Sequence, residues 1–406
     1  MSGALEFLQS LQAECGGVIP IERYMQEALY HPELGYYARN IRTVGRRGDF
    51  ATSASLGEAL GSAIARWIRK NRISENAFGI WKGGKGENNP RPSLPHPVPL
   101  PVIPRNPSCF PAFQIPNLFP SWHVIEAGAG TGELARTVLR RLGMWGRRGL
   151  VYHIVETSPV LRAEQQRALP QFRVAWHDSM SDALAACKGR ALIFSNELAD
   201  AFPCRVFERR DGHWIEVGVR IEEGRVVECA FPRTPPEGLP ADLPEGQRIE
   251  MHAAVAEWIA TWSGDVREAL MLTIDYGDTM PALYHRRKRG TLRAYFHHQR
   301  FEGMEIYHRF GKQDLTADVN FTDLRNWTEH CGWRTVALTT QGEFLAAYGA
   351  RRSGLHDAQL ADHTGAGAAF KVLECEKRED EAASGPTSTE PRKNKSWAKI
   401  KPPLHV

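Results

Sequence analysis

Residues 124–143 read VIEAGAGTGELARTVLRRLG, in which an apolar run meets an acid, then three glycines at alternate positions, then a helix-like segment. The acid is Glu126, and the glycines are Gly128, Gly130 and Gly132. Glycine lets the chain turn tightly between a strand and a helix and brings the backbone close to a ligand without a Cβ atom in the way. The stretch is either a plain strand-to-helix turn or a ligand-binding loop, and three alternating glycines favour the loop.

The segments around this loop alternate between strand-like and helix-like patterns. Such alternation is typical of β-α-β units and implies a parallel sheet with helices on its faces. The strand-like runs are almost continuously apolar, as expected for strands buried on both faces. The predicted strands cover residues 122–127, 151–156, 172–176, 191–197, 269–278, 334–341 and 368–377. The sequence therefore predicts an α/β protein.

Changes in composition divide the chain into parts. Residues 90–120 hold eleven of the twenty-six prolines, a density that neither a helix nor a central strand accommodates. Beyond the fourth predicted strand, alternation at period two with Asp-Gly and Glu-Gly turn signals predicts antiparallel strands. The predicted organisation is a helical extension or lid at 1–74, a proline-rich insertion or linker at 75–120, a core at 121–376 with an antiparallel insertion at about 204–268, and a disordered tail at 377–406.

The bulk composition limits the classes of function. Of 406 residues, 42% are hydrophobic and 24% charged, and without a run of ~20 apolar residues no membrane span is predicted. The formal net charge of +4 is small and dispersed, which does not favour nucleic-acid binding. Seven scattered cysteines without a Cys-x-x-Cys pair predict neither a disulfide framework nor a zinc site. The first residues lack a signal or transit pattern, which predicts a cytoplasmic, bacterial protein.

Two classes of ligand use glycine loops of this kind, dinucleotides and S-adenosylmethionine. A dinucleotide loop usually reads G-x-G-x-x-G and rests a pyrophosphate on the helix N-terminus, but Glu133 stands where the third glycine would fall. Glu126 would also repel a pyrophosphate and attract a cation. S-adenosylmethionine carries an ammonium and a sulfonium and no phosphate. The loop and its acid therefore predict S-adenosylmethionine as the cofactor, bound by Glu126, Gly128, Gly130 and Gly132.

Two further acids end neighbouring predicted strands. Glu156 lies twenty-four residues after Gly132, close to the ~20-residue separation at which a second-strand carboxylate holds ribose hydroxyls. Asp178 follows the third predicted strand and is interpreted either as an acceptor for the adenine amino group or as a helix N-cap. These acids extend the predicted cofactor site along the carboxyl edge of the sheet.

The stretch SNELADAF, residues 195–202, supplies candidates for contact with the methyl acceptor. Glu197 and Asp200 follow the fourth predicted strand, and their i, i+3 spacing puts both on one side of a helical turn. If the methyl acceptor is a guanidinium, which stays protonated, carboxylates must grip it, and both acids are then predicted to be catalytic; the alternative is a helix N-cap. Asn196 is predicted to contact the cofactor or to cap the turn. Asp275, at another strand end, is either structural support or catalytic.

Several longer blocks of sequence resemble one family. They are YMQEALYHPELGYY, GDFATS, EAGAGTGEL, VETSPVLRAEQ, NELADAFP, IDYG, GTLRAY, DLTADVNFTDL and TTQGEFL. In content and order they resemble the MidA-like methyltransferases, which are related to the mitochondrial complex I assembly factor that methylates arginine. The proline-rich stretch departs from the pattern of that family and leaves the cofactor motifs intact.

The resemblance implies a class I methyltransferase fold, with a Rossmann-like sheet of seven strands, an N-terminal helical extension and an insertion before the fifth strand. It places Gly48, Asp49 and Phe50 over the cofactor. Gly48 and Phe50 are then cofactor-binding, and Asp49 is a third catalytic candidate that binds either the methionine ammonium or the guanidinium. Tyr36 and Tyr37 are expected to serve as packing and lid residues. The resemblance also implies a protein substrate, for which a respiratory-complex subunit is one candidate.

Taken together, the sequence predicts an S-adenosylmethionine-dependent methyltransferase that acts on arginine in a protein and requires no metal. A methyltransferase for small molecules would share the fold and the cofactor. A protein that binds the cofactor and assists assembly with little catalysis is a third hypothesis. A nicotinamide oxidoreductase is disfavoured by Glu126 and by the missing third glycine of its motif.

Overall fold

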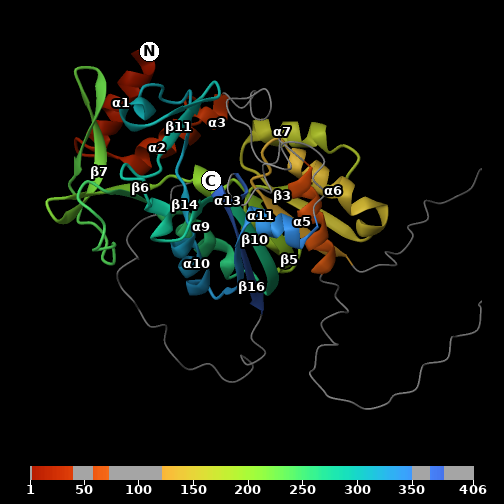
Figure 1. The fold of residues 1–406 in the computed structure, drawn as a ribbon. Coiled ribbons are helices and arrows are strands. Elements are labelled where there is room, and N and C mark those ends of the chain that lie inside the picture. The colour runs from red at the N-terminus through yellow and green to blue at the C-terminus, as the bar shows by residue number, and fades with distance from the viewer. Residues whose placement is uncertain (1, 40–57, 73–120, 350–365, 379–406) are drawn as a thin grey trace, which may run out of the picture.

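The main sheet carries seven strands in the order β15-β16-β10-β5-β2-β3-β4 (Figure 1). The structure is a computed structural model that describes residues 2–39, 58–72, 121–349 and 366–378. Strands β2 to β5 and β10 run parallel, while β16 runs antiparallel to both of its neighbours. The bounds are β2 Trp122–Ala127, β3 Leu150–Val155, β4 Val174–His177, β5 Arg190–Asn196, β10 Glu268–Asp278, β15 Arg334–Thr340 and β16 Phe370–Arg378. The predicted Rossmann-like sheet of seven strands is confirmed, and the short β14 (Val319–Asn320) adds a parallel pairing at the end of β10.

Helices cover both faces of this sheet and bury its apolar residues in two clusters. One cluster lies under α5 (Ala59–Lys70), α6 (Glu133–Gly146) and α11 (Gln341–Ala347), and the other lies under α8 (Met180–Ala186), α9 (Ala253–Ser263) and α10 (Phe321–His330). The short helices α7 (Pro159–Ala168) and α13 (Ala366–Ala369) complete the layers. Among the helices in the described ranges, none combines the length and the apolar character needed to cross a bilayer.

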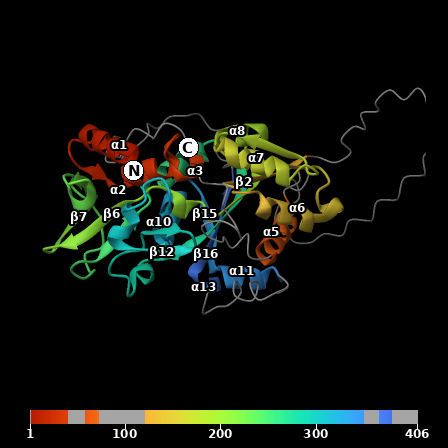
Figure 2. The ribbon, with the colours of Figure 1, turned by 90° about the horizontal axis from the view of Figure 1, so that it is seen from above.

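A second lobe stands at one end of the core (Figures 1 and 2). Its larger sheet has the order β1-β7-β6-β9 with β8 beside β7, and these strands are β1 Ile19–Pro20, β6 Arg205–Arg210, β7 His213–Glu222, β8 Arg225–Phe231 and β9 Arg248–Met251. All its pairings are antiparallel, so the predicted antiparallel insertion is confirmed. The sheet itself ends at Met251, because α9 inside the predicted range of 204–268 packs on the main sheet instead.

A smaller sheet in this lobe was absent from the sequence prediction. Its three short antiparallel strands are β11 Arg293–Phe296, β12 Gln299–Phe301 and β13 Asp314–Thr316. They form an excursion between β10 and α10, together with the 3-10 helices η4 (Ala282–Tyr284) and η5 (Gly303–Tyr307). Their apolar side chains share one cluster with α1 (Ser2–Glu14) and α2 (Ile21–Tyr30). The excursion matters because β13 reaches the candidate site.

The structure divides the predicted helical extension at 1–74 between the two parts of the molecule. Helices α1, α2 and the short α3 (Tyr36–Arg39) belong to the second lobe. Helix α5 packs against α6 and the main sheet. The two helices approach closely at Gly61, where an added Cβ atom would lie 2.5 Å from Cγ2 of Thr137. Helix α5 is therefore a layer of the core rather than a lid.

We expect Gly61→Val to lower the free energy of unfolding by about 2 kcal/mol, because the larger side chain would force α5 away from α6. Chemical denaturation measures this change. Ser62→Val, one position along the same helix and only partly buried, is the matched control and should cost less than about 1 kcal/mol. Equal losses in the two variants would contradict the close packing of these helices.

Candidate functional site

The glycine loop joins β2 to α6, as predicted. Gly128, Gly130 and Gly132 all have positive φ, at 69°, 53° and 83°. A Cβ atom on Gly128 would lie 2.7 Å from Cδ1 of Leu198, so a larger residue would collide with the chain that follows β5. A Cβ atom on Gly130 would meet nothing within 4 Å. Gly130 therefore keeps open a space that the protein itself does not fill.

Gly130 also lines a cavity of about 300 Å³ at the carboxyl ends of β2, β3, β4 and β5. The predicted site residues that line it are Glu126, Gly128, Gly130, Glu156, Asp178, Asn196, Glu197 and Asp200. Gly132 is the exception, because it precedes α6 and faces Gln165, whose Cα atom would lie 3.3 Å from a Cβ atom added to this glycine. The remaining candidates, Gly48, Asp49 and Phe50, lie outside the described residues.

Glu126 is a buried carboxyl at the cofactor end of the cavity. Its side chain accepts a hydrogen bond of 2.5 Å from the Tyr152 hydroxyl, and the residue is 2% exposed. Burial raises the pKa of Glu126 to about 7, and the hydrogen bond from Tyr152 partly offsets that rise. Because a buried carboxylate gains strongly from a nearby positive charge, this position suits a cationic group beside the glycine loop.

Glu156 is held in place at the end of β3. One oxygen accepts from the Ser158 backbone N–H and the other from the Gln165 side-chain amide, both at 2.9 Å. The same Gln165 amide donates to the carbonyl oxygen of Gly130 at 2.8 Å, and Trp176 Nε1 donates to Oε1 of Gln165 at 3.0 Å. Gln165, which the sequence prediction missed, thus ties the glycine loop to the predicted ribose carboxylate.

Asp178 lies at the rim of the cavity. Its side chain is 80% exposed and forms an ion pair of 2.5 Å with Arg162. The helix N-cap proposed as the alternative role belongs to the next residue, because the Ser179 side chain accepts from the backbone N–H of Asp182. A contact between Asp178 and adenine stays a prediction.

The turn after β5 presents the acids predicted to be catalytic. Glu197 adopts φ of 50°, an uncommon conformation for a residue other than glycine. Asp200 lies in the 3-10 helix η3 (Ala199–Ala201). The buried Asp275 carboxylate accepts from the backbone N–H groups of Leu198 and Ala199, at 3.1 and 2.8 Å, and from that of Asp200 at 3.3 Å. Asp275 is therefore a positioning residue for this turn.

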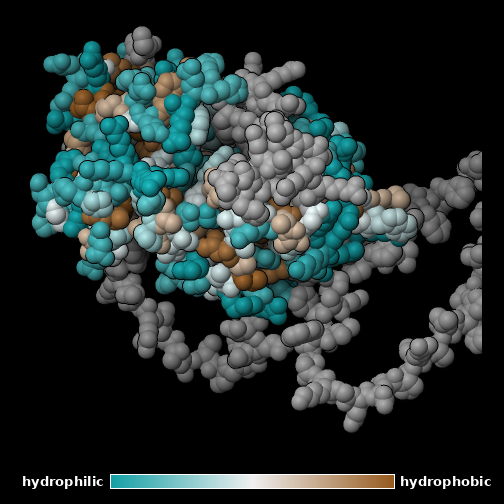
Figure 3. Space-filling view, in the orientation of Figure 1, coloured by the Kyte–Doolittle hydropathy of each residue, from teal (hydrophilic) through white to brown (hydrophobic). Residues whose placement is uncertain are grey.

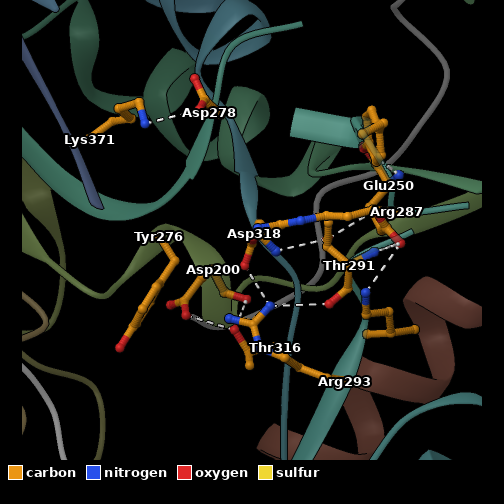
Figure 4. Close-up of polar contacts among 12 residues, drawn as sticks. Asp200, Glu250, Tyr276, Asp278, Arg287, Thr291, Arg293, Thr316, Asp318 and Lys371 are labelled. Atoms are coloured by element: carbon orange, nitrogen blue, oxygen red, sulfur yellow. Dashed lines mark hydrogen bonds and ion pairs between the residues drawn. The ribbon is translucent and has the colours of Figure 1, made fainter. Parts of the chain in front are cut away.

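The second lobe completes the acceptor end of the cavity. Thr316 of β13 donates its hydroxyl to Oδ2 of Asp200 at 2.6 Å (Figure 4). Asp314, also on β13, accepts from the Tyr37 hydroxyl at 3.0 Å. Tyr37 stacks on Tyr30 with ring centroids 5.3 Å apart. The sequence singled out Tyr37 as a lid residue and did not identify Tyr30, Asp314 or Thr316 as site residues.

All charged residues in the described lining of the cavity are acidic. Seven carboxylate side chains line it, from Glu126, Glu133, Glu156, Asp178, Glu197, Asp200 and Asp314. Within the same described lining there is no lysine, arginine or histidine. The Arg293 guanidinium donates to Oδ1 of Asp318 at 2.5 Å (Figure 4) and is not part of this lining. Such a cavity favours cationic ligands. In the described ranges no group of three or more His, Cys, Asp or Glu residues could hold a metal ion.

The donor set of this cavity fits S-adenosylmethionine. Acids at the loop suit its ammonium and sulfonium, Glu156 suits its ribose, and the space beside Gly130 admits a ligand close to the backbone. Trp262 of α9 lines the cavity, and its buried Nε1 has no hydrogen-bond partner among the described residues. Buried donors of this kind are normally satisfied by a hydrogen-bond partner.

Comparisons with known proteins agree with this geometry. Residues 109–339 match the family model described as "Putative S-adenosyl-L-methionine-dependent methyltransferase". The chain is 26% identical to the mitochondrial protein arginine methyltransferase NDUFAF7 homolog of Drosophila melanogaster, over 81% of this chain and 71% of the relative. It is also 26% identical to NDUFAF7 of Danio rerio, over 82% and 74%.

One solved structure is similar in fold over most of the chain. It is a protein from Burkholderia thailandensis bound to S-adenosyl-homocysteine, 25% identical, with a TM-score of 0.73 over 93% of this chain and 92% of that one. The fold, the cofactor-binding geometry and the family match lead to one conclusion. The chain belongs to the MidA-like family of class I methyltransferases, and S-adenosyl-L-methionine is its cofactor.

Proposed function

We propose that this methyltransferase acts on an arginine side chain of a protein. The observation that carries the proposal is the acceptor end of the cavity, where Glu197, Asp200 and Asp314 converge without a basic side chain in the described lining. A guanidinium remains protonated at any working pH, so its binding needs carboxylates. The names of the relatives, which are protein arginine methyltransferases, support the same acceptor.

The residues at one end of the cavity bind the cofactor, and those at the other end bind the methyl acceptor. When bound, the cofactor supplies an electrophilic methyl group on a sulfonium. Glu197 and Asp200 then hold the guanidinium and bias one nitrogen toward the methyl group, since positioning supplies much of the rate in such a displacement. Burial raises the pKa of Asp314 to about 7, with the charge of Asp200 as the next cause. A carboxyl with that pKa is suited to take up the proton that the methylated nitrogen releases.

The nature of the methylated product tests this function. Purified protein and methyl-labelled S-adenosylmethionine would be incubated with lysate from a strain that lacks the protein, and the labelled protein would then be hydrolysed. We expect label in methylarginine. Label confined to solvent-extractable molecules would favour a small-molecule methyltransferase instead. Cofactor binding without any transfer would favour an assembly protein. The cytoplasmic location and a respiratory-complex subunit as the substrate stay predictions.

The raised pKa of Asp314 predicts opposite effects of pH on activity and stability. An aspartate in an unfolded chain ionises near pH ~4, so between about pH 4 and 7 the folded state holds a proton that the unfolded state has lost. The Asp314 contribution to stability therefore falls as pH rises through this window. The ionised form of Asp314, which can accept the proton from the methylated nitrogen, accumulates as pH passes 7. We expect kcat/KM for an arginine peptide to rise between pH 6 and 8.

The Asp314→Asn variant separates these effects. It should flatten the rise in kcat/KM and lose less thermal stability between pH 5 and 7 than the unaltered protein. Asp323→Asn is the matched control, because burial raises the pKa of Asp323 to about 6 but this residue does not line the cavity. The control should alter the stability profile only. An unchanged activity profile in Asp314→Asn would contradict the role of this carboxyl.

A further inference from the structure

A turn at the end of α6 presents two adjacent apolar side chains to solvent. Met144 and Trp145 are each 70% exposed, whereas the other large exposed apolar residues of the described chain reach 44% at most. Gly143, with φ of 68° and ψ of 176°, breaks the helical path just before them. The turn lies at the end of the core that is remote from the second lobe (Figures 1 and 2).

Hydrogen bonds to neighbouring elements fix this turn. The Arg69 guanidinium of α5 donates to the carbonyl oxygen of Leu142 at 3.0 Å and also to that of Arg141. The backbone N–H of Arg147 donates to the carbonyl oxygen of Gly143 at 3.2 Å. These contacts satisfy the carbonyl groups left open at the helix end. Met144 and Trp145 are therefore held outward by a built turn rather than by a frayed helix end.

The surface around the two apolar residues is strongly basic. Residues 58–72 and 133–150, which contain α5 and α6, hold nine lysines and arginines and two glutamates. Each glutamate pairs with an arginine, Glu58 with Arg141 and Glu133 with Arg136. The exposed basic residues nearest the turn are Arg69, Lys70, Arg72, Arg140, Arg141 and Arg148. Nine basic and two acidic residues leave seven positive charges in excess, which is more than the net charge of +4 of the whole chain.

We propose that this turn and the basic residues around it, the α6 tip, dock the enzyme on an anionic phospholipid surface. Tryptophan and methionine can enter the boundary between headgroups and acyl chains, where an indole is favoured. Arginines around them pair with lipid phosphates. Figure 3 shows this end of the molecule as a mainly hydrophilic surface with a small apolar group at its right-hand tip, which is the pattern of an interfacial anchor.

RNA is the rival partner for a basic surface with an aromatic residue. The Arg148 guanidinium lies 4.6 Å from the Trp145 ring centroid and covers one face of the indole, which is the kind of face that a base would stack on. Met144 adds apolar surface and no group for base recognition. The two side chains together match a lipid interface better than a nucleic acid.

Sedimentation with vesicles tests the proposal on the full-length protein. The probes are vesicles of phosphatidylcholine alone and of equimolar phosphatidylcholine and phosphatidylglycerol, at low and high salt. We expect binding to the anionic vesicles only, weakened by salt. Met144→Ser with Trp145→Ser should lower the partition coefficient at least about tenfold. Arg140→Ser with Arg148→Ser should lower it about 25-fold, at about fivefold for each arginine.

The control is a double variant in the second lobe that also replaces exposed apolar and basic side chains by serine. Met304→Ser with Arg225→Ser removes an exposed methionine and an exposed arginine of the second lobe and should bind vesicles as the unaltered protein does. All variants should keep their thermal midpoint and their methyl transfer to a soluble peptide, which separates this proposal from the proposed function. The single variants Trp145→Ser and Arg140→Ser repeat the test with less change to the fold.

Three outcomes would overturn the proposal. They are an absence of binding to anionic vesicles, equal binding by the tip variants and the control pair, and binding of single-stranded RNA through the same residues without binding of vesicles.

Discussion

A Glu197→Gln variant should bind S-adenosylmethionine with unchanged affinity and lose on the order of 100-fold in kcat/KM for methyl transfer. A charge-assisted hydrogen bond contributes about 1.5–3 kcal/mol, and the amide leaves the guanidinium without one of its counter-charges. Glutamine has nearly the same shape and can follow the same backbone, so the turn built on Asp275 should remain. Calorimetric titration with cofactor and steady-state kinetics measure the two effects separately.

Glu133→Gln is the matched control for this prediction. Glu133 also lines the cavity, but its carboxylate pairs with Arg136 at 2.8 Å on α6, away from the acceptor end. The control should keep its activity within a few fold. Asp200→Asn, by contrast, should resemble Glu197→Gln, since Asp200 lies three residues further along the same turn. Full turnover in Glu197→Gln would remove this residue from the catalytic set.

The second large effect is expected from Gly130→Val, which should lower cofactor affinity by at least about 100-fold. Its side chain would project into the space that the protein leaves open for a ligand. The positive φ of Gly130 also imposes a backbone cost of roughly 1–2 kcal/mol on any residue with a Cβ atom. Calorimetric titration would measure binding, and thermal unfolding would measure the backbone cost.

Gly212→Val separates the backbone cost from the effect on binding. Gly212 has φ of 75° in the turn between β6 and β7, and a Cβ atom there would also meet nothing within 4 Å. This control should show a comparable loss of stability with unchanged cofactor affinity. If Gly130→Val bound the cofactor as well as Gly212→Val does, the assignment of the glycine loop would fail.

The cofactor half of the cavity could be predicted from the sequence because its geometry is local. Parallel strands end at one edge of a sheet, so acids that follow successive strands, such as Glu126 and Glu156, must lie near each other and near the glycine loop. The same rule placed Glu197 and Asp200 beside them. The alternative prediction, that Asp178 caps the following helix, was wrong by one residue, because the N-cap is Ser179.

The acceptor half depends on contacts between distant segments. Asp314 and Thr316 lie on a three-residue strand whose pairing with β11 has no strong local signal. Tyr30 reaches the cavity only because α2 packs in the second lobe, where its hydroxyl donates to the carbonyl oxygen of Ala201 at 2.9 Å. Gln165 is a polar residue in an amphipathic helix. The sequence pattern of α7 does not distinguish this buried glutamine from an exposed glutamine, because its burial depends on how α7 packs against the glycine loop.

The pairing of β1 with β7 joins segments that are synthesised far apart in time. Ile19 pairs with Val219, and Gly218 allows the approach because a Cβ atom there would lie 2.6 Å from Cγ1 of Val18. At ~5–20 residues per second, the intervening two hundred residues take on the order of 10–40 s to emerge from the ribosome. During that interval the apolar side of α2 lacks the strands on which it packs in the folded protein. Tyr30, at the end of α2, is therefore part of a lobe that has not yet folded. The enzyme gains its acceptor pocket only after the second lobe has been translated, long after the helix that supplies Tyr30.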